Sequence, residues 1–415
     1  VPKGWTIYDR HGRRAMEVEG RKSHFSTSTA SPNTKDALTG DYHETRVADI
    51  ATGARVADAL PNIDFVMPMG SSQDVDGNVA DLYEFEAVIT NTTKPMVFIG
   101  YTPTGCEYVF EMAAVVAGGQ DRLRERPFVM LYPEAISPFV FPREVVDRIF
   151  IAADRFMPQV PGATAQPGAT APMTLAGTVV QVTAESLIHI SLAQLRKPGC
   201  PVSMSGNVGI LDMATALMAF GAPEGSLGLA AQAQVAQSFG LPTWGLAGST
   251  DAKRLDAQAG IESTFGIFAQ ALAGLNLIHD VGYMASGMAC SCEQLVMGNE
   301  IIGMTRRFVE GIRVDADTLA RDVIDAVGPG GNFLAQRHTV DHLRKELWQA
   351  RLLNRQPIAT WQEAGQSTME DRVRDEVRQI VETHQPEPLD GKILDEVQRL
   401  KRDGEKEILD RLGKT

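Results

Sequence analysis

The stretch Leu-Asn-Leu-Ile-His-Asp-Val-Gly-Tyr (275–283) is typical of a buried strand that ends in polar and aromatic residues. Seven more segments are apolar strand candidates, and several begin near proline and end in small, polar or aromatic residues. Parallel strands buried on both faces appear in a sequence as continuous apolar runs rather than as alternating patterns. We therefore predict eight parallel strands, at residues 24–32, 63–70, 95–103, 127–135, 158–166, 201–208, 242–250 and 275–283.

The spacing of these segments decides between two kinds of parallel sheet. One strand and its return helix take about 30 residues or more, and the segments start every 31 to 43 residues. Residues 107–116 and 143–153, which lie between segments, carry apolar stripes at helical spacing. Eight such units are what a closed barrel needs, whereas open doubly wound sheets usually have fewer strands and often a glycine-rich phosphate loop. We predict an α/β fold, a (β/α)8 TIM barrel with a C-terminal helical extension.

We expect three parts along the chain. Residues 1–20 form an N-terminal segment, which we expect to be truncated because the chain begins at Val1 without a methionine. Residues 21–345 form the barrel domain. Residues 346–415 form a charge-rich helical extension, with apolar residues at helical spacing in 393–400.

The composition argues against several classes of protein. A net charge of −13 argues against a nucleic-acid binder, which would present a basic face. No apolar run approaches the roughly 20 residues of a membrane helix. Four cysteines in 415 residues are too few for a disulfide scaffold. We expect a cytoplasmic protein whose partners include neither nucleic acid nor membrane.

Polar and aromatic residues near the ends of the predicted strands are candidates for a site, because barrel sites lie at the C-terminal ends of the strands. His279 is suited to donate a hydrogen bond, act as a base or bind a metal, although a structural hydrogen bond to a neighbouring strand is about equally common. We predict a catalytic role for His279. The predicted substrate-binding residues are Tyr101, Glu134, Gln166, Asn207, Trp244, Asp251, Lys253 and Tyr283.

Two groups among these candidates have a specific chemistry. Asp251, Lys253 and Arg254 follow the seventh strand and could hold an amide or a carboxylate, or they could be a helix cap with solvated charges. Aromatic residues also lie near strand ends, and aromatic faces attract quaternary ammonium groups, although such residues are often only packing. These residues are Tyr101, Tyr132, Trp244 and Tyr283.

Cys290 and Cys292 suggest zinc, which would activate a bound thiol or alcohol by lowering its pKa. A Cys-x-Cys pair needs further ligands, however, and no second pair lies nearby in the sequence. Two buried, small apolar side chains are the better interpretation. We predict no metal site.

Five ordered blocks of sequence carry a family resemblance. They are Ala-Asp-Ala-Leu-Pro-Asn-Ile-Asp-Phe-Val (57–66), Gly-Ser-Thr-Asp-Ala-Lys (248–253), Gln-Ala-Gly-Ile-Glu-Ser (258–263), Asn-Leu-Ile-His-Asp-Val-Gly-Tyr (276–283), and Ser-Gly-Met-x-x-Ser-x-Glu-Gln-Leu-Val (286–296) followed by Asn299 and Glu300. Over roughly residues 20 to 345 the chain resembles the trimethylamine methyltransferase family. These are corrinoid-dependent enzymes, and members without pyrrolysine demethylate quaternary amines such as glycine betaine.

The resemblance implies a barrel with a deep cavity, to which a cognate corrinoid protein presents cobalt(I). Family members that act on trimethylamine carry pyrrolysine, whereas this sequence has only the twenty standard residues, so we expect a betaine-type substrate. By resemblance, His279 with Lys253 or Arg254 would hold a substrate carboxylate, and Tyr101 and Trp244 would face the ammonium group. We expect a homo-oligomer. The alternatives are a zinc-dependent corrinoid methyltransferase and a non-catalytic barrel that binds betaine or corrinoid.

Overall fold

The eight predicted strand segments form a closed ring in the computed structural model, which describes residues 1–36 and 38–413. All neighbours in the ring pair in parallel, and their order in the ring is their order in the sequence. The last strand pairs with the first, Leu277 opposite His24, which closes the barrel. The segments are β3 (His24–Thr27), residues 65–66, β6 (Met96–Phe98), β7 (Val129–Leu131), residue 159, β9 (Met204–Ser205), β13 (Thr243–Leu246) and β14 (Leu277–Val281).

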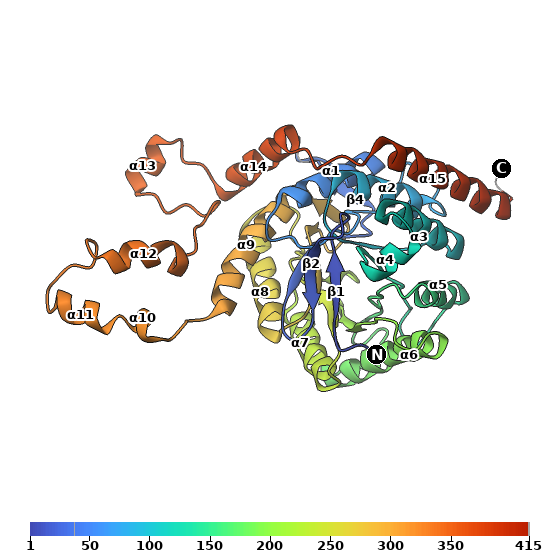
Figure 1. Cartoon of the computed structure of the whole chain (residues 1–415), viewed down its shortest axis with the longest axis horizontal. Coiled ribbons are helices and arrows are strands. Elements are labelled where there is room, and N and C mark those ends of the chain that lie inside the picture. Colours follow the sequence, from blue (N-terminus) through green and yellow to red (C-terminus); the bar gives the residue numbers. More distant parts are fainter. Residues whose placement is uncertain (37, 414–415) are drawn as a thin grey trace.

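A helix follows each of these segments and lies on the outside of the ring, as Figure 1 shows. The short helix α4 (Gln120–Glu125) is an addition to the third unit. The predicted (β/α)8 TIM barrel is therefore confirmed. The eight helices are α1 (Val47–Ala59), α2 (Ala80–Asn91), α3 (Pro103–Ala117), α5 (Arg143–Asp154), α6 (Leu175–Arg196), α7 (Pro223–Ser238), α8 (Ala257–Ala273) and α9 (Cys292–Glu310).

Local sequence signals set the ends of several helices. The hydroxyl of Thr102 caps α3 by accepting the N–H of Gly105, and Pro103 occupies the first turn, where no N–H is needed. Asp256 caps α8 in the same way. Both helices end at a glycine with left-handed backbone, Gly118 and Gly274, a conformation that glycine adopts without steric cost.

A hairpin lies across the N-terminal end of the barrel. Its strands β1 (Trp5–Tyr8) and β2 (Arg14–Val18) pair antiparallel, and Figure 1 shows them over the centre of the ring. Ile7, Met16 and Val18 are fully or almost fully buried against apolar side chains of the barrel interior. The hairpin therefore closes this end of the barrel and leaves the opposite end for a site.

Helix α6 is long and apolar enough to cross a membrane by length and composition alone. In the structure it is one of the barrel helices. Its inner side chains, such as Ile190 and Ala193, pack with Ile149 of α5 and Ala236 of α7. Its apolar composition thus has a structural explanation within the barrel.

Short pairs of strands surround the C-terminal end of the barrel. A small sheet joins β15 (Tyr283–Met284), β16 (Ala289–Ser291), β4 (Asn33–Lys35) and β5 (Tyr42–Glu44). Two further pairs flank it, β8 (Thr164–Ala165) with β10 (Asn207–Val208), and β11 (Ile210–Leu211) with β12 (Met218–Ala219). The loops after the strands are therefore held by backbone pairing of their own.

Beyond Glu310 the chain leaves the barrel as an arm and then returns. Figure 1 shows the arm, residues 312–365, extending away from α9. Its helices are α10 (Ala316–Leu319), α11 (Arg321–Val327), α12 (Arg337–Glu346) and α13 (Ile358–Glu363). None of the residues in these four helices is buried. The division of the chain at residue 345 stays a prediction.

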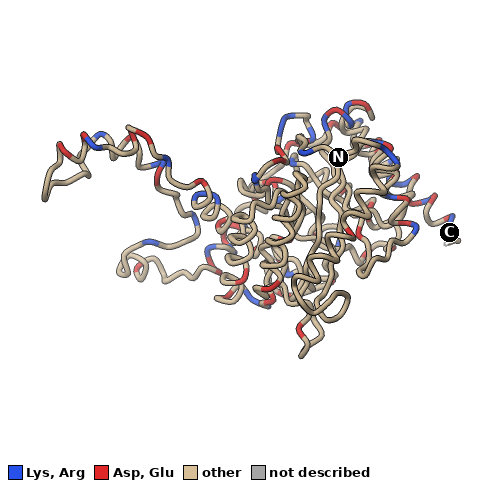
Figure 2. The backbone as a smooth tube through the Cα atoms, turned by 90° about the horizontal axis from the view of Figure 1, so that it is seen from below, with Lys and Arg blue, Asp and Glu red and all other residues tan. Residues whose placement is uncertain are grey.

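Two long helices bring the chain back over the barrel, α14 (Met369–Thr383) and α15 (Gly391–Arg411). Gly404 of α15 lies so close to Tyr108 of α3 that a Cβ atom would come within 2.8 Å of the ring. Figure 2 shows acidic and basic residues interspersed along the arm and α15. The predicted charge-rich helical extension is thus present.

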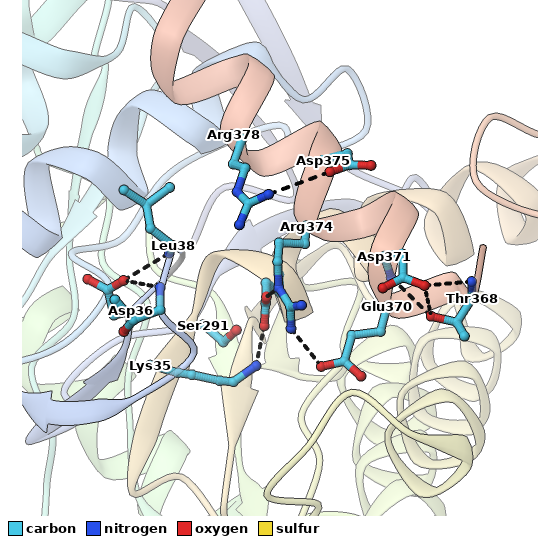
Figure 3. Close-up of polar contacts among 12 residues, drawn as sticks. Lys35, Asp36, Leu38, Ser291, Thr368, Glu370, Asp371, Arg374, Asp375 and Arg378 are labelled. Carbon is cyan, nitrogen blue, oxygen red and sulfur yellow. Dashed lines mark hydrogen bonds and ion pairs between the residues drawn. The ribbon is translucent and has the colours of Figure 1, made fainter. Parts of the chain in front are cut away.

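A buried ion-pair network fixes α14 to the mouth of the barrel. The carboxylate of Glu293, in the first turn of α9, pairs with the ammonium group of Lys35 on β4 and with Nε of Arg374 on α14, at 3.1 Å. Glu293 and Lys35 are 1% and 6% exposed. Figure 3 shows Lys35 and Arg374 pointing toward the same place, with Glu370 on the other side of Arg374.

We predict that Glu293→Gln lowers the free energy of unfolding by about 3 kcal/mol, because it leaves the buried Lys35 ammonium without a counter-charge. Urea unfolding of the full chain measures the change. Glu370→Gln is the matched control, since Glu370 is 39% exposed at the edge of the same network. We expect that control to cost less than about 1 kcal/mol. Equal losses in the two variants would contradict the assignment.

Candidate functional site

His279 and Asp280 contact each other at the C-terminal end of β14. Nδ1 of His279 lies 2.7 Å from Oδ1 of Asp280, and both residues are 2–3% exposed. Consecutive side chains of a strand normally point to opposite faces. Here Asp280 has a φ of +80°, and the pairing of β14 with β3 is irregular between Ile278 and Val281. The irregularity turns the carboxylate toward the imidazole, as bulges beside active sites often do.

Two aromatic rings pack around the imidazole. The indole of Trp244 stacks on His279 with 4.4 Å between ring centroids and 14° between the planes. The ring of Tyr132, just after β7, lies 5.8 Å from His279 and 5.4 Å from Trp244. Gly162 makes room for Tyr132, because a Cβ atom there would lie 2.3 Å from the ring. Residues from the seventh and eighth strands, which are neighbours, and from the fourth strand across the ring thus build one aromatic cluster with a histidine inside it.

Several buried polar atoms in this region have no hydrogen-bond partner among the residues that the structure describes. They belong to three residues on β9, β10 and β14: Oγ of Ser205, Oδ1 of Asn207 and Nε2 of His279. Buried polar atoms are almost always hydrogen-bonded, to protein, water or ligand. A concentration of such atoms at the strand ends of a barrel is what a site for a small polar molecule requires.

Glu134 adds a recessed carboxylate to this group. Its side chain is reached by solvent, but the surrounding barrel mouth displaces much of the bulk water. This desolvation raises the pKa of Glu134, and the nearby His279 opposes the rise while Asp280 adds to it. Burial, and then the charge of Glu134, raise the pKa of the Tyr132 hydroxyl well above its ordinary value. The cluster therefore contains two carboxyl groups beside its aromatic faces.

Tyr101, in the loop after β6, contacts a second group of acidic residues. Its hydroxyl donates to Glu84 at 3.0 Å, and its backbone N–H donates to Asp81 at 3.0 Å. Both acids lie on the buried side of α2, and burial raises the pKa of each to about 7. We did not single out Asp81 or Glu84 from the sequence. Their signal was the presence of two carboxyl groups three residues apart within an apolar helix.

The charged residues after β13 have contacts outside the aromatic cluster. The carboxylate of Asp251 accepts the backbone N–H groups of Phe220 and Gly221, each at 2.9 Å, and so holds the loop before α7. Lys253 is exposed and donates to the carbonyl oxygen of Asp251 at 2.8 Å. Arg254 is also exposed. None of the contacts that the structure gives these side chains is with His279.

The remaining predicted residues lie around the mouth. Asn207 on β10 is paired in register with Thr164 of β8, two residues before Gln166. Gln166 is half-buried, and its backbone N–H donates to the hydroxyl oxygen of Thr170 at 2.9 Å. Tyr283 is buried against Phe220, with 5.6 Å between ring centroids. Gln166 and Asn207 thus share one side of the mouth, and Tyr283 lies beneath the loop that Asp251 holds.

Cys290 and Cys292 are both buried as free thiols. Burial raises the pKa of each to about 12, and Cys290 is within hydrogen-bond distance of Ser28, at 3.2 Å. Zinc binds the thiolate form of cysteine. The surroundings of this pair therefore favour protonated thiols and the interpretation as small apolar side chains.

Comparisons with known proteins show the family of the chain. The sequence model of the trimethylamine methyltransferase family matches residues 1–406. The trimethylamine methyltransferase MttB of Desulfitobacterium hafniense is 34% identical over 394 residues, which are 95% of this chain and 79% of that protein. A glycine betaine methyltransferase from another strain of that species is 30% identical over 395 residues, 95% of this chain and 82% of that protein.

A third relative comes from an archaeon. The trimethylamine methyltransferase MttB of Methanosarcina thermophila is 33% identical over 366 residues, 87% of this chain and 74% of that protein. The family model and the relatives each cover most of the chain. The chain belongs to the trimethylamine methyltransferase family and is a methyltransferase.

Proposed function

We propose that the protein transfers a methyl group from a small quaternary amine of the betaine type to the cobalt(I) of a corrinoid bound to a partner protein. The observation that carries this proposal is the cluster of Trp244, Tyr132 and His279 beside the recessed carboxylate of Glu134. Aromatic faces and a carboxylate are the groups that hold a quaternary ammonium ion, and each cation–π contact contributes about 2 kcal/mol when it is desolvated. A methyltransferase that has glycine betaine methyltransferase among its relatives is consistent with such a substrate.

The two ends of a betaine match different parts of the site. The ammonium end would lie against Trp244 and Tyr132, with Glu134 as the counter-charge. The carboxylate end would accept a hydrogen bond from Nε2 of His279, an atom that has no partner among the described residues. Asp280, in contact with Nδ1, would fix the orientation of the imidazole ring. His279 thus acts by binding and orienting the substrate.

The reaction requires few other groups from the protein. Cobalt(I) supplies the nucleophile, and the C–N bond breaks with its electron pair remaining on nitrogen. The nitrogen is already positively charged, so it leaves as a neutral tertiary amine without a proton. The residues of the site therefore need to hold one N-methyl group in line with the acceptor, and correct positioning alone accounts for large rate accelerations.

The rim of the mouth has the character of a docking surface for the corrinoid protein. Loops after the fourth, fifth, sixth and eighth strands present large apolar side chains that are 46–68% exposed. Exposed apolar patches of this kind mark sites of interaction. They surround the end of the barrel that holds His279, where the corrinoid would have to approach. The residues are Ile136, Phe139, Val140, Met173, Met213, Leu217 and Met288.

Two further parts of the proposal concern the setting of the enzyme. The four cysteines are free, as a reducing cytoplasm would keep them. The arm has exposed apolar side chains, including Ile312 and Leu334 at 85% and 80% exposure, which suit contact between copies of the chain. We therefore propose a cytoplasmic homo-oligomer, and light scattering on the purified chain would give its mass.

We predict that the protein with cob(I)alamin forms methylcobalamin from glycine betaine or a related betaine, as followed by absorbance. His279→Ala should lower kcat/KM by about 100-fold, because it removes a charge-assisted hydrogen bond of up to ~3 kcal/mol. His11→Ala is the control, since His11 lies on the loop of the hairpin at the opposite end of the barrel. Product from trimethylamine alone, or full activity in His279→Ala, would refute the proposal.

We predict a pH dependence that belongs to Glu134. Its raised pKa keeps the carboxyl neutral up to a higher pH than an ordinary glutamate, and only the ionised form attracts the ammonium group. The value of kcat/KM should therefore be low at pH values below the raised pKa of Glu134. It should increase as the pH rises through that pKa and Glu134 ionises. Glu134→Gln should abolish this limb and lower the plateau about tenfold. Glu144→Gln, on the exposed start of α5, should leave the profile unchanged. An unchanged limb in Glu134→Gln would exclude Glu134 as its source.

A further inference from the structure

We propose that Asp317, His338 and His342 bind a divalent transition-metal ion of the zinc type, which ties α10 to α12 in the arm. Within residues 1–36 and 38–413, these are the three side chains whose possible ligand atoms, drawn from His, Cys, Asp and Glu, all lie within 4.8 Å of one another. Two imidazoles and one carboxylate are a ligand set that zinc takes readily.

The two histidines share one face of α12 because they are four residues apart. Their rings stack with 4.2 Å between centroids and 26° between planes. Nε2 of His342 lies 3.5 Å from Oδ1 of Asp317. Two ligand atoms of a tetrahedral zinc ion are separated by about 3.3 Å. This pair is therefore already at the spacing that coordination needs.

The third ligand atom gives an independent indication. Nε2 of His338 is buried and has no hydrogen-bond partner among the described residues. The two carboxylate oxygens of Asp317 have different neighbours. Oδ2 lies 3.6 Å from Arg313, and Oδ1 faces His342. A metal ion beside Nε2 of His338 and Nε2 of His342 would give the unpaired nitrogen of His338 a partner and would bind Oδ1 of Asp317. Solvent would supply the fourth ligand, since Asp317 is 61% exposed.

A bound metal ion would hold together helices of the arm that have no buried residues. None of the residues in α10 to α13 is buried, so no apolar core of its own holds these helices in place. Small elements without a core are commonly held by a metal, a disulfide or a partner. A metal bound to Asp317 and to α12 would close the loop of residues 318–337 and reduce the entropy of the unlinked arm.

This site is separate from the proposed methyl-transfer site. The arm extends away from the barrel in Figure 1, and the three ligands come from helices beyond Glu310. The metal would therefore have a structural role in the arm. It differs from a zinc site at Cys290 and Cys292, which lie at the barrel mouth.

The first test is calorimetric titration of the EDTA-treated full chain with Zn²⁺. We expect one ion per chain, with the affinity lowered at least about tenfold by His338→Ala, by His342→Ala and by the nearly isosteric Asp317→Asn. His384→Ala is the matched control, a half-exposed histidine that pairs with Asp58 outside the arm. It should leave binding unchanged. Absence of zinc binding, retention of binding in both histidine variants, or its loss in Cys290→Ser would overturn the proposal.

The second test measures the link between α10 and α12 directly. Arg321 and Arg337 are exposed trypsin sites within the loop that the ion would close. Zinc should slow cleavage at these sites about tenfold in the wild-type chain and not in His342→Ala, because cleavage requires local opening. Equal cleavage rates with and without zinc in the wild-type chain would exclude the structural role.

Discussion

Closure of the barrel depends on a buried amide, Asn276, in the turn of chain that leads into β14. Its Oδ1 accepts the backbone N–H of Thr243 at 3.0 Å, and its Nδ2 donates to the carbonyl oxygens of Glu19, Gly20 and Lys22 at 3.0–3.2 Å. One side chain thus joins β13, β14 and the connection from β2 to β3. A ring of strands has no open edge, and Asn276 lies where the last strand meets the first.

The regular pairing at Asn276 contrasts with the irregular pairing a few residues further along the same strand. Between Ile278 and Val281 the register of β14 with β3 breaks, and Asp280 adopts a left-handed backbone. Such a conformation costs of order 1–3 kcal/mol in a residue other than glycine and persists only where its surroundings enforce it. One end of β14 therefore holds the barrel together, and the other gives up regular geometry to bring His279 and Asp280 into contact.

The fold could be predicted because each strand is a local run of apolar residues, and the intervals between these runs can be read from the sequence. The position of His279 at a strand end followed from the same spacing. Its contact with Asp280 did not, because adjacent strand residues are expected on opposite faces and only the backbone φ of Asp280 reverses this. The hydrogen bond from Tyr101 to Glu84 was also out of reach, since it joins residues from two units of the barrel. Whether the predicted residues bind substrate stays a prediction.

Residues 351–353 of the arm are held to the barrel by a carboxylate. Oε1 of Glu300, on α9, accepts the backbone N–H groups of Arg351 and Leu352 at 2.9 Å and that of Leu353 at 3.4 Å. Residues 312–350 of the arm therefore leave from the end of α9 and return to the same helix. Residues 312–350 could therefore be lengthened or shortened without moving either attachment point on α9.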